Sequence, residues 1–401
     1  MIGDGPGRDA YDEAIDRVYR SILAREADVA RERSRGRELF EDLERHPPAH
    51  RELLVANSLR FRSRALGEIL LEQSHEAGFS DPVRASQLAR LAVTLAGLLS
   101  EPIGGQPGEE GIDGLRARAW AQLGNAQRIG CDFAGAERAF EAAAGLLEGG
   151  RVSPLETARV LDLQASLKRE QRRFDEAAAL MDRVIALYRK VGQKVLLGRS
   201  LKQKSMILGE SGDLEGEIAL LRRALELLSP EHEPRTFLAA RHNLISALCE
   251  AGRPRDAFAL LFHTRPLYLK QGDRMNLLRL RWLEGTVALG LQRHEQAAVA
   301  FHEVREAFLE LGLDYDAALA ALDLTEVYAL QGRTADVRRL AEEMLEVFQS
   351  RNIHREALGA LAVLQQAARL EKAGLVLVRE VSGFLKKARN RPDLRFDQPS
   401  S

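Results

Sequence analysis

The sequence predicts an all-α fold, a right-handed solenoid of about seven to eight stacked helix pairs. Residues of the helix-favouring kind dominate, whereas β-branched runs are scarce and aromatic residues make up only 5% of the chain. A small or turn-following residue also recurs every 40 or 41 residues where a second helix opens. These residues are Ala136, Ala177, Glu217, Ala257, Ala297 and Val337. A helix pair cannot bury its own apolar face, so stacked pairs share a core and leave a long surface for binding.

Composition limits the classes of function. The chain has 401 residues, with 58 basic and 59 acidic side chains that nearly cancel, so no global field attracts nucleic acid or an anionic membrane. Cys131 and Cys249 are too few for a disulfide framework and are expected to be free thiols. Residues 1–20 lack a signal-peptide pattern, and no apolar run reaches the roughly 18 residues of a membrane span. We therefore expect a cytoplasmic protein.

The N-terminal region is expected to form a charged helical arm. Residues 1–8 are Gly-rich and predict a flexible tail, and residues 9–46 predict the arm. Tyr11, Ile15, Val18 and Ile22 form one apolar stripe, and Pro47 and Pro48 end the helix. This arm could cap the solenoid, pair with another chain or dock a partner.

The remaining elements follow in order. Residues 50–99 predict a divergent first helix pair, with helices over 50–78 and 82–99, and residues 100–114 a flexible Gly/Pro loop. Six regular repeats are expected over residues 115–350, with readable starts such as the capping box of Ser153 and Glu156. C-terminal capping helices over 355–388 and a flexible tail over 389–401 complete the chain.

The regular units resemble tetratricopeptide repeats. In the clearest unit, Trp120, Leu123 and Gly124 lie on the first helix, and Phe133, Ala136, Phe140 and Ala143 on the turn and second helix. The repeat is longer than the family's usual length of about 34 residues. It is similar to the repeats of kinesin light chains and of bacterial peptide-sensing regulators. No helix-turn-helix pattern is found in residues 1–50, which weakens a transcription-factor interpretation.

The resemblance implies a concave groove lined by one face of each first helix. The groove side chains that it implies for this sequence are Arg118, Asn125, Arg128, Arg159, Asp162, Arg169, Arg199, Lys202, His242, Arg279 and Trp282. In the last unit they are Leu319, Leu322 and Glu326. Asn243, one position beyond His242, lies near the asparagine that contacts peptide backbone in the related repeats.

These groove residues allow two interpretations. The basic stripe could hold an acidic or carboxylate-bearing peptide, or its arginines could pair with nearby Glu and Asp. Asn243 could bind a peptide backbone or lie unused on a helix surface. Trp282 could be an apolar anchor for a partner or part of the core between repeats.

Chemical motifs are weak. His302 and Glu303 lack the second histidine of a zinc-protease helix, and no glycine-rich phosphate loop is present, so we expect no enzyme, no metal and no cofactor. The expected function is a non-catalytic scaffold or adaptor that binds a protein or peptide in the groove, without nucleic acid or membrane. A peptide-gated sensor controlling an effector is the main alternative, followed by an RNA-binding repeat or an enzyme. The sequence leaves the oligomeric state open.

Overall fold

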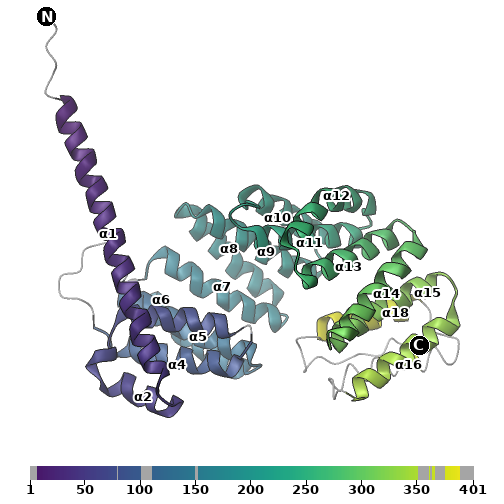
Figure 1. The fold of residues 1–401 in the computed structure, drawn as a ribbon, viewed down its shortest axis with the longest axis horizontal. Helices are drawn as coiled ribbons and strands as arrows, with labels where there is room; N and C mark the ends of the chain where they lie inside the picture. Colours follow the sequence, from purple (N-terminus) through teal and green to yellow (C-terminus); the bar gives the residue numbers. More distant parts are fainter. Residues whose placement is uncertain are drawn as a thin grey trace, which may run out of the picture. The chain divides into compact units, whose positions relative to one another are not determined.

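The computed structural model describes residues 7–78, 80–100, 111–149, 152–350, 361, 364–365 and 375–388. Every element in these ranges is a helix, and they contain no strand, which confirms the all-α class. No helix in the same ranges has the length and apolar character needed to cross a membrane. The chain divides into two compact units, residues 1–193 and 194–401. Figure 1 shows the helices along the chain, coloured by sequence.

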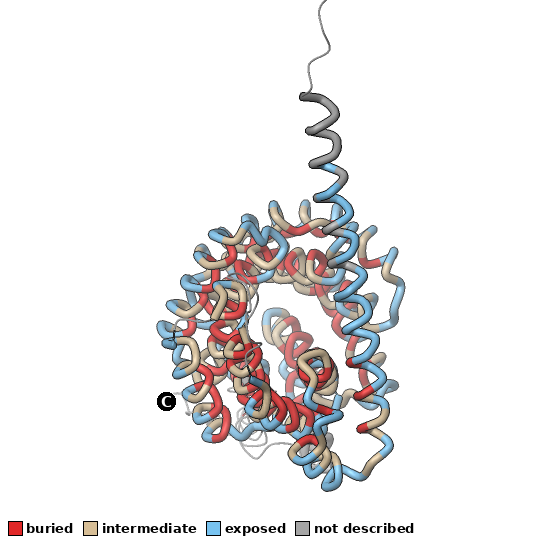
Figure 2. Tube along the Cα trace, turned by 90° about the vertical axis from the view of Figure 1, so that its left-hand side faces the viewer, coloured by how far each residue is buried: buried red, intermediate tan, exposed pale blue. Residues whose placement is uncertain are grey.

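Unit 1 opens with α1 (Gly7–Glu44), α2 (Pro48–Asn57), η1 (Leu59–Phe61), α3 (Arg64–Ala77) and α4 (Pro82–Leu98). The end of α1 packs on α3, with Leu39 and Leu43 buried, whereas residues 27–35 are exposed (Figure 2). The expectation of one helix over 50–78 is wrong, because the backbone turns to an extended conformation at Ser58 and separates α2 from α3. α4 starts as predicted, since Asp81 accepts a hydrogen bond from the Arg84 N–H.

Two regular pairs complete unit 1: α5 (Ile112–Ile129) with α6 (Phe133–Glu148), and α7 (Pro154–Glu170) with α8 (Phe174–Lys190). Small residues let the paired helices approach closely, since a Cβ added at Gly124 would lie 2.9 Å from the Phe140 ring. Only half of the predicted capping box forms. Ser153 Oγ accepts from the Glu156 N–H at 3.3 Å, but the Glu156 carboxylate pairs with arginines.

The described part of unit 2 contains four helix pairs and one further helix. The pairs are α9 (Lys194–Ser211) with α10 (Leu214–Leu227), α11 (Pro234–Glu250) with α12 (Pro254–Gln271), α13 (Arg274–Gly290) with α14 (His294–Glu310), and α15 (Asp314–Leu330) with α16 (Thr334–Ser350). The final helix is α18 (Leu375–Ala388). At the small-residue position of α10 the chain carries Glu217, whose carboxylate packs directly against Gly209.

The turn inside each pair of unit 2 contains one residue with positive φ. Gly212, Gly252 and Gly332 supply it at 97°, 70° and 70°, and Gln292 supplies it at 60°. After Gly252 and after Gln292, the next N–H bonds back to the first helix at 2.8 and 2.9 Å, as in a Schellman motif. Gln292 therefore holds a conformation that favours glycine.

The last helix covers a surface that the sequence predicted to be open. α18 packs on α15, and Val378 and Leu385 share one hydrophobic cluster with Leu319 and Leu322 (Figure 1). Glu326 accepts a hydrogen bond from Arg379 Nε at 2.7 Å. The groove predicted for the last unit is thus wrong at these three positions. The predicted tails over 1–6 and 389–401, and residues 101–110 of the predicted loop, lie outside the described residues.

Candidate functional site

The predicted basic stripe in unit 1 is largely neutralised from within. Arg118 pairs with both Glu68 and Glu156, and Arg159 Nη1 lies 2.8 Å from Glu156 Oε1. Glu156 is only 1% exposed, and a buried carboxylate requires such cations. Arg118 and Arg159 therefore stabilise the stack, as in the second interpretation of the stripe.

Arg128 is held in the same way, because it pairs with Glu170 and donates to the buried Asn125 Oδ1 at 2.9 and 3.2 Å. Burial lowers the pKa of Arg128, and Glu170 opposes this shift. Nearby, burial raises the pKa of Asp162 to about 6. Arg169 is half-buried, and its positive charge also lowers the pKa of Arg128. Arg128, Asn125 and Glu170 are thus bound to one another.

In unit 2, Arg199 is also paired, with its Nη2 and Nε at 2.6 and 3.1 Å from Glu233 Oε2. Lys202 is half-buried on the next turn of α9, where its carbonyl oxygen accepts from Ser205 Oγ at 2.7 Å. Arg199 therefore does not present an uncompensated cation.

His242 is joined to the neighbouring second helix. Its Nδ1 lies 2.7 Å from the Tyr268 hydroxyl oxygen, and the two rings meet edge to face. Burial, helped by the positive charge of Arg279, lowers the pKa of His242 to about 4, while burial raises the pKa of Tyr268. His242 is therefore neutral at neutral pH.

Asn243 and Arg279 differ from the other predicted groove residues. Asn243 is half-buried on α11, and its amide forms no hydrogen bond with any residue that the structure describes. Arg279 is exposed on α13, the first helix of the next pair. Its Nη1 lies 3.4 Å from Asn276 Oδ1, but no carboxylate in the described ranges is within ion-pair distance. These two side chains can donate to a bound ligand.

Trp282 has a structural position. Its Nε1 donates to Asp323 Oδ2 at 2.6 Å, and its ring packs edge to face on Phe308 with centroids 5.6 Å apart. Lys386 of α18 occupies the other Asp323 oxygen at 2.8 Å. The interpretation of Trp282 as a partner anchor is therefore wrong, and the core interpretation holds.

The candidate site is thus smaller than the predicted stripe, and it lies on the first helices of unit 2 around Asn243 and Arg279. The sequence predicted both as groove residues but did not predict how they differ from the other groove residues. Arg118 and Arg199 differ from Arg279 because glutamates pair with them, and these glutamates lie 50 and 34 residues away in the sequence, at Glu68 and Glu233. In the described part of the chain, no three His, Cys, Asp or Glu side chains are grouped to hold a metal ion.

No protein-family profile matches the chain, and no curated protein sequence does. Solved structures are similar. The apo form of RapI is 11% identical over 81% of this chain and 87% of its own, with a TM-score of 0.58. A Rap protein complexed with Competence and Sporulation Factor is 10% identical over 81% and 87%, with a TM-score of 0.57. Aspartyl phosphate phosphatase F from Bacillus subtilis is 14% identical over 75% and 71%, with a TM-score of 0.55.

These similarities concern the fold, because the identities are low. They confirm the prediction from the repeat pattern: this is an all-α helical repeat protein with the tetratricopeptide-type fold. The names of the similar proteins describe an aspartyl phosphate phosphatase and a complex with Competence and Sporulation Factor, and both descriptions belong to those proteins.

Proposed function

We propose that this chain is a regulatory protein that binds a peptide segment on the first-helix face of unit 2. The observation that carries the proposal is the pair Asn243 and Arg279, on the first helices of successive pairs. An amide both donates and accepts, which suits a peptide backbone of any sequence. An arginine without a carboxylate partner suits an acidic side chain or a terminal carboxylate.

The surroundings of these residues support the same ligand class. His242 is neutral and tied to Tyr268, so Arg279 is the positive group beside it. On the far side, Lys386 and Trp282 are both bound to Asp323. A carboxylate entering this face therefore meets the guanidinium of Arg279. The Rap protein of the same fold that is complexed with Competence and Sporulation Factor supports the regulatory part of the proposal by analogy.

The test measures peptide binding to the full chain. Peptides of about 10 residues are selected from a random display library, and their dissociation constants are measured by calorimetry. Arg279→Ala should weaken binding by about 1.5 to 3 kcal/mol, roughly 10- to 150-fold, because a charged hydrogen bond is lost. Asn243→Ala should weaken it by about 1 kcal/mol.

The matched control is Arg222→Ala, which removes an exposed arginine from the second helix α10. It should leave the dissociation constant unchanged. Selected peptides that bind equally well to the Arg279 and Asn243 variants would place the peptide elsewhere and contradict the proposal.

A further inference from the structure

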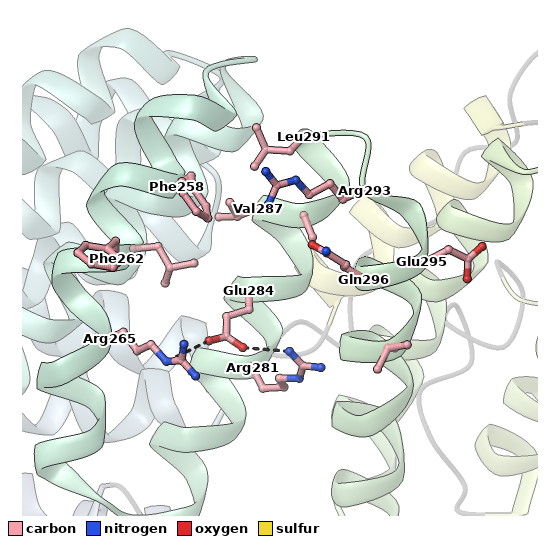
Figure 3. A pocket seen from close by; sticks show the side chains of 13 residues that line it. Phe258, Phe262, Arg265, Arg281, Glu284, Val287, Leu291, Arg293, Glu295 and Gln296 are labelled. Carbon is pink, nitrogen blue, oxygen red and sulfur yellow. Dashed lines mark hydrogen bonds and ion pairs between the residues drawn. The ribbon is translucent and has the colours of Figure 1, made fainter.

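A groove lies on the second-helix side of unit 2, between α12 and α14, with α13 as its floor (Figure 3). Its volume is about 560 Å³. Phe258 and Phe262 line one side, Val299 the other, and Leu291 the end of the floor. The groove shares no residue with the surface around Asn243 and Arg279.

Phe262 is the first sign that this groove has a role beyond the fold. Its side chain is 70% exposed, one helical turn after Phe258, which is 47% exposed. Because the repeat has a fixed register, each of the other units has a residue equivalent to Phe262. It is polar in all of them: Glu141, Asp182, Arg222, His302 and Glu342. The fold therefore does not require an apolar residue there.

Leu291 and Val299 are also more apolar than the residues at the equivalent positions of the other repeats. Val299 is 52% exposed. The residues equivalent to Leu291 are small or polar: Gly130, Gln171, Ser211, Ala251 and Gln331. Those equivalent to Val299 are small or charged: Arg138, Ala179, Ala219, Ala259 and Arg339. Large apolar side chains at otherwise small or polar positions thus gather in one groove, as expected of an interaction surface.

Arg293 adds a positive charge at the edge of this apolar surface. The equivalent arginines each pair with a carboxylate three residues further on: Arg173 with Glu176 at 2.6 Å, Arg253 with Asp256 at 2.8 Å, and Arg333 with Asp336 at 2.8 Å. After Arg293 that position holds Gln296. Arg293 instead lies over the Phe258 ring at 5.5 Å, and no carboxylate within the described ranges pairs with it.

The other arginines of the groove already have carboxylate partners. Glu284 Oε1 and Oε2 lie 3.6 and 3.0 Å from Arg265 and Arg281 (Figure 3). Glu295 accepts from Gln331 Nε2 at 3.0 Å. Among the described residues that line the groove, Arg293 is therefore the cation without a carboxylate partner, so the groove is complementary to apolar side chains accompanied by one carboxylate.

We propose that the α12–α14 groove binds an amphipathic helical segment of another protein. Two apolar side chains of that segment, one turn apart, cover Phe258, Phe262 and Val299, and an Asp or Glu reaches Arg293. The exposure of Phe262 favours a protein segment over a small molecule, because a molecule confined to the groove would leave most of that ring in water. Two helices flanking a groove also offer the ridges between which a third helix packs.

The experiment uses the full chain with Asn243→Ala and Arg279→Ala, so that the first-helix surface contributes no selection. Helical peptides of about 16 residues are selected from a display library, and their affinities are measured by fluorescence anisotropy. The selected peptides should share two apolar residues three or four positions apart and one acidic residue. Phe262→Glu should weaken their binding at least about tenfold.

The matched control is Arg222→Glu, which places the same side chain at the same register position on α10. It should leave affinity unchanged, and both variants should keep the wild-type circular dichroism because both positions are exposed. In a second arm, Arg293→Glu should weaken binding, and replacing the acidic residue of the peptide by Lys should restore it.

Three results would overturn the proposal. One is equal binding of the peptides to the Phe262→Glu variant, and another is the absence of rescue in the charge exchange. The third is a groove that yields no peptide but is saturated by dodecanoate, which would identify a site for a small amphipathic acid instead.

Discussion

Trp282 and Asp323 are joined by a hydrogen bond of 2.6 Å between the indole Nε1 and Oδ2, across two first helices of unit 2. Asp323 is 7% exposed, and its other oxygen accepts from Lys386 Nζ at 2.8 Å. Burial alone would lower the pKa of Lys386, but the Asp323 charge outweighs it and the pKa is raised. One carboxylate thus connects α13, α15 and α18.

Asp323→Ala should therefore destabilise the protein by about 2 to 4 kcal/mol, because it leaves the indole N–H and an ammonium group without their acceptor. The measurement is the free energy of unfolding in urea. Asp256→Ala, which breaks an exposed pair with Arg253, is the control and should cost at most about 0.5 kcal/mol. Equal losses in the two variants would contradict the connecting role of Asp323.

The stability of unit 2 should depend on pH through Glu217. Burial, together with the charges of Glu250 and Glu210, raises its pKa from the ordinary 4.5 to about 7. The folded protein therefore holds this proton more tightly than the unfolded chain does. The resulting stability is fully present below pH 4.5 and is lost as the pH rises through about 7.

Glu217→Gln should remove this dependence and exceed the wild type in stability by about 1 kcal/mol at pH 8, after allowance for partial exposure. The free energy of unfolding in urea, measured at several pH values between 4.5 and 8, tests this expectation. Glu215→Gln, at an exposed site on the same helix, should retain the wild-type slope. A Glu217→Gln profile parallel to the wild type would show that the pKa of Glu217 is the same in the folded and unfolded chain.

The two glycines Gly124 and Gly145 should respond oppositely to alanine. A Cβ at Gly124 would lie 2.9 Å from the Phe140 ring, which is buried, whereas one at Gly145 meets nothing within 4 Å. Gly124→Ala should destabilise by about 1 to 3 kcal/mol through overpacking. Gly145→Ala should stabilise by about 0.5 to 1 kcal/mol through helix propensity. Thermal unfolding of both variants measures the difference, and a shift of the same sign would refute the packing account.

The turns at Gly252 and Gln292 allow a reciprocal exchange. Because both residues have positive φ in equivalent motifs, Gln292→Gly should stabilise and Gly252→Gln destabilise, each by about 1 kcal/mol. Chemical denaturation midpoints should move in opposite directions. A loss of stability in Gln292→Gly would mean that the glutamine side chain contributes more than its backbone conformation costs.

The sequence predicted the helical repeat fold because the residues that determine it are local and recur in each repeat. The positions of Gly124 and Ala136 follow from the repeat, and the starts of helices follow from caps such as Asp81. The sequence did not predict the helix break at Ser58 or the packing of α18 against Leu319 and Leu322. Both depend on contacts between elements that are distant in the sequence, and no periodic signal marks them.

The binding surface was only partly readable for the same reason. The repeat register placed Arg118, Arg199 and Arg279 alike on first helices. What separates them is whether a glutamate on a neighbouring helix reaches them, as Glu233 reaches Arg199 at 2.6 Å. The two interpretations of Trp282 were likewise decided by Asp323, one repeat further along the chain.

The way α18 lies against α15 bears on self-association. The last repeat of a stack has an apolar face that the next repeat would cover. When this face is exposed, a second molecule can bind there and extend the stack. In this chain, α18 covers that face of α15 with Val378, Val381 and Leu385. Removing residues 375–388 should therefore convert a terminated stack into one that joins other copies end to end.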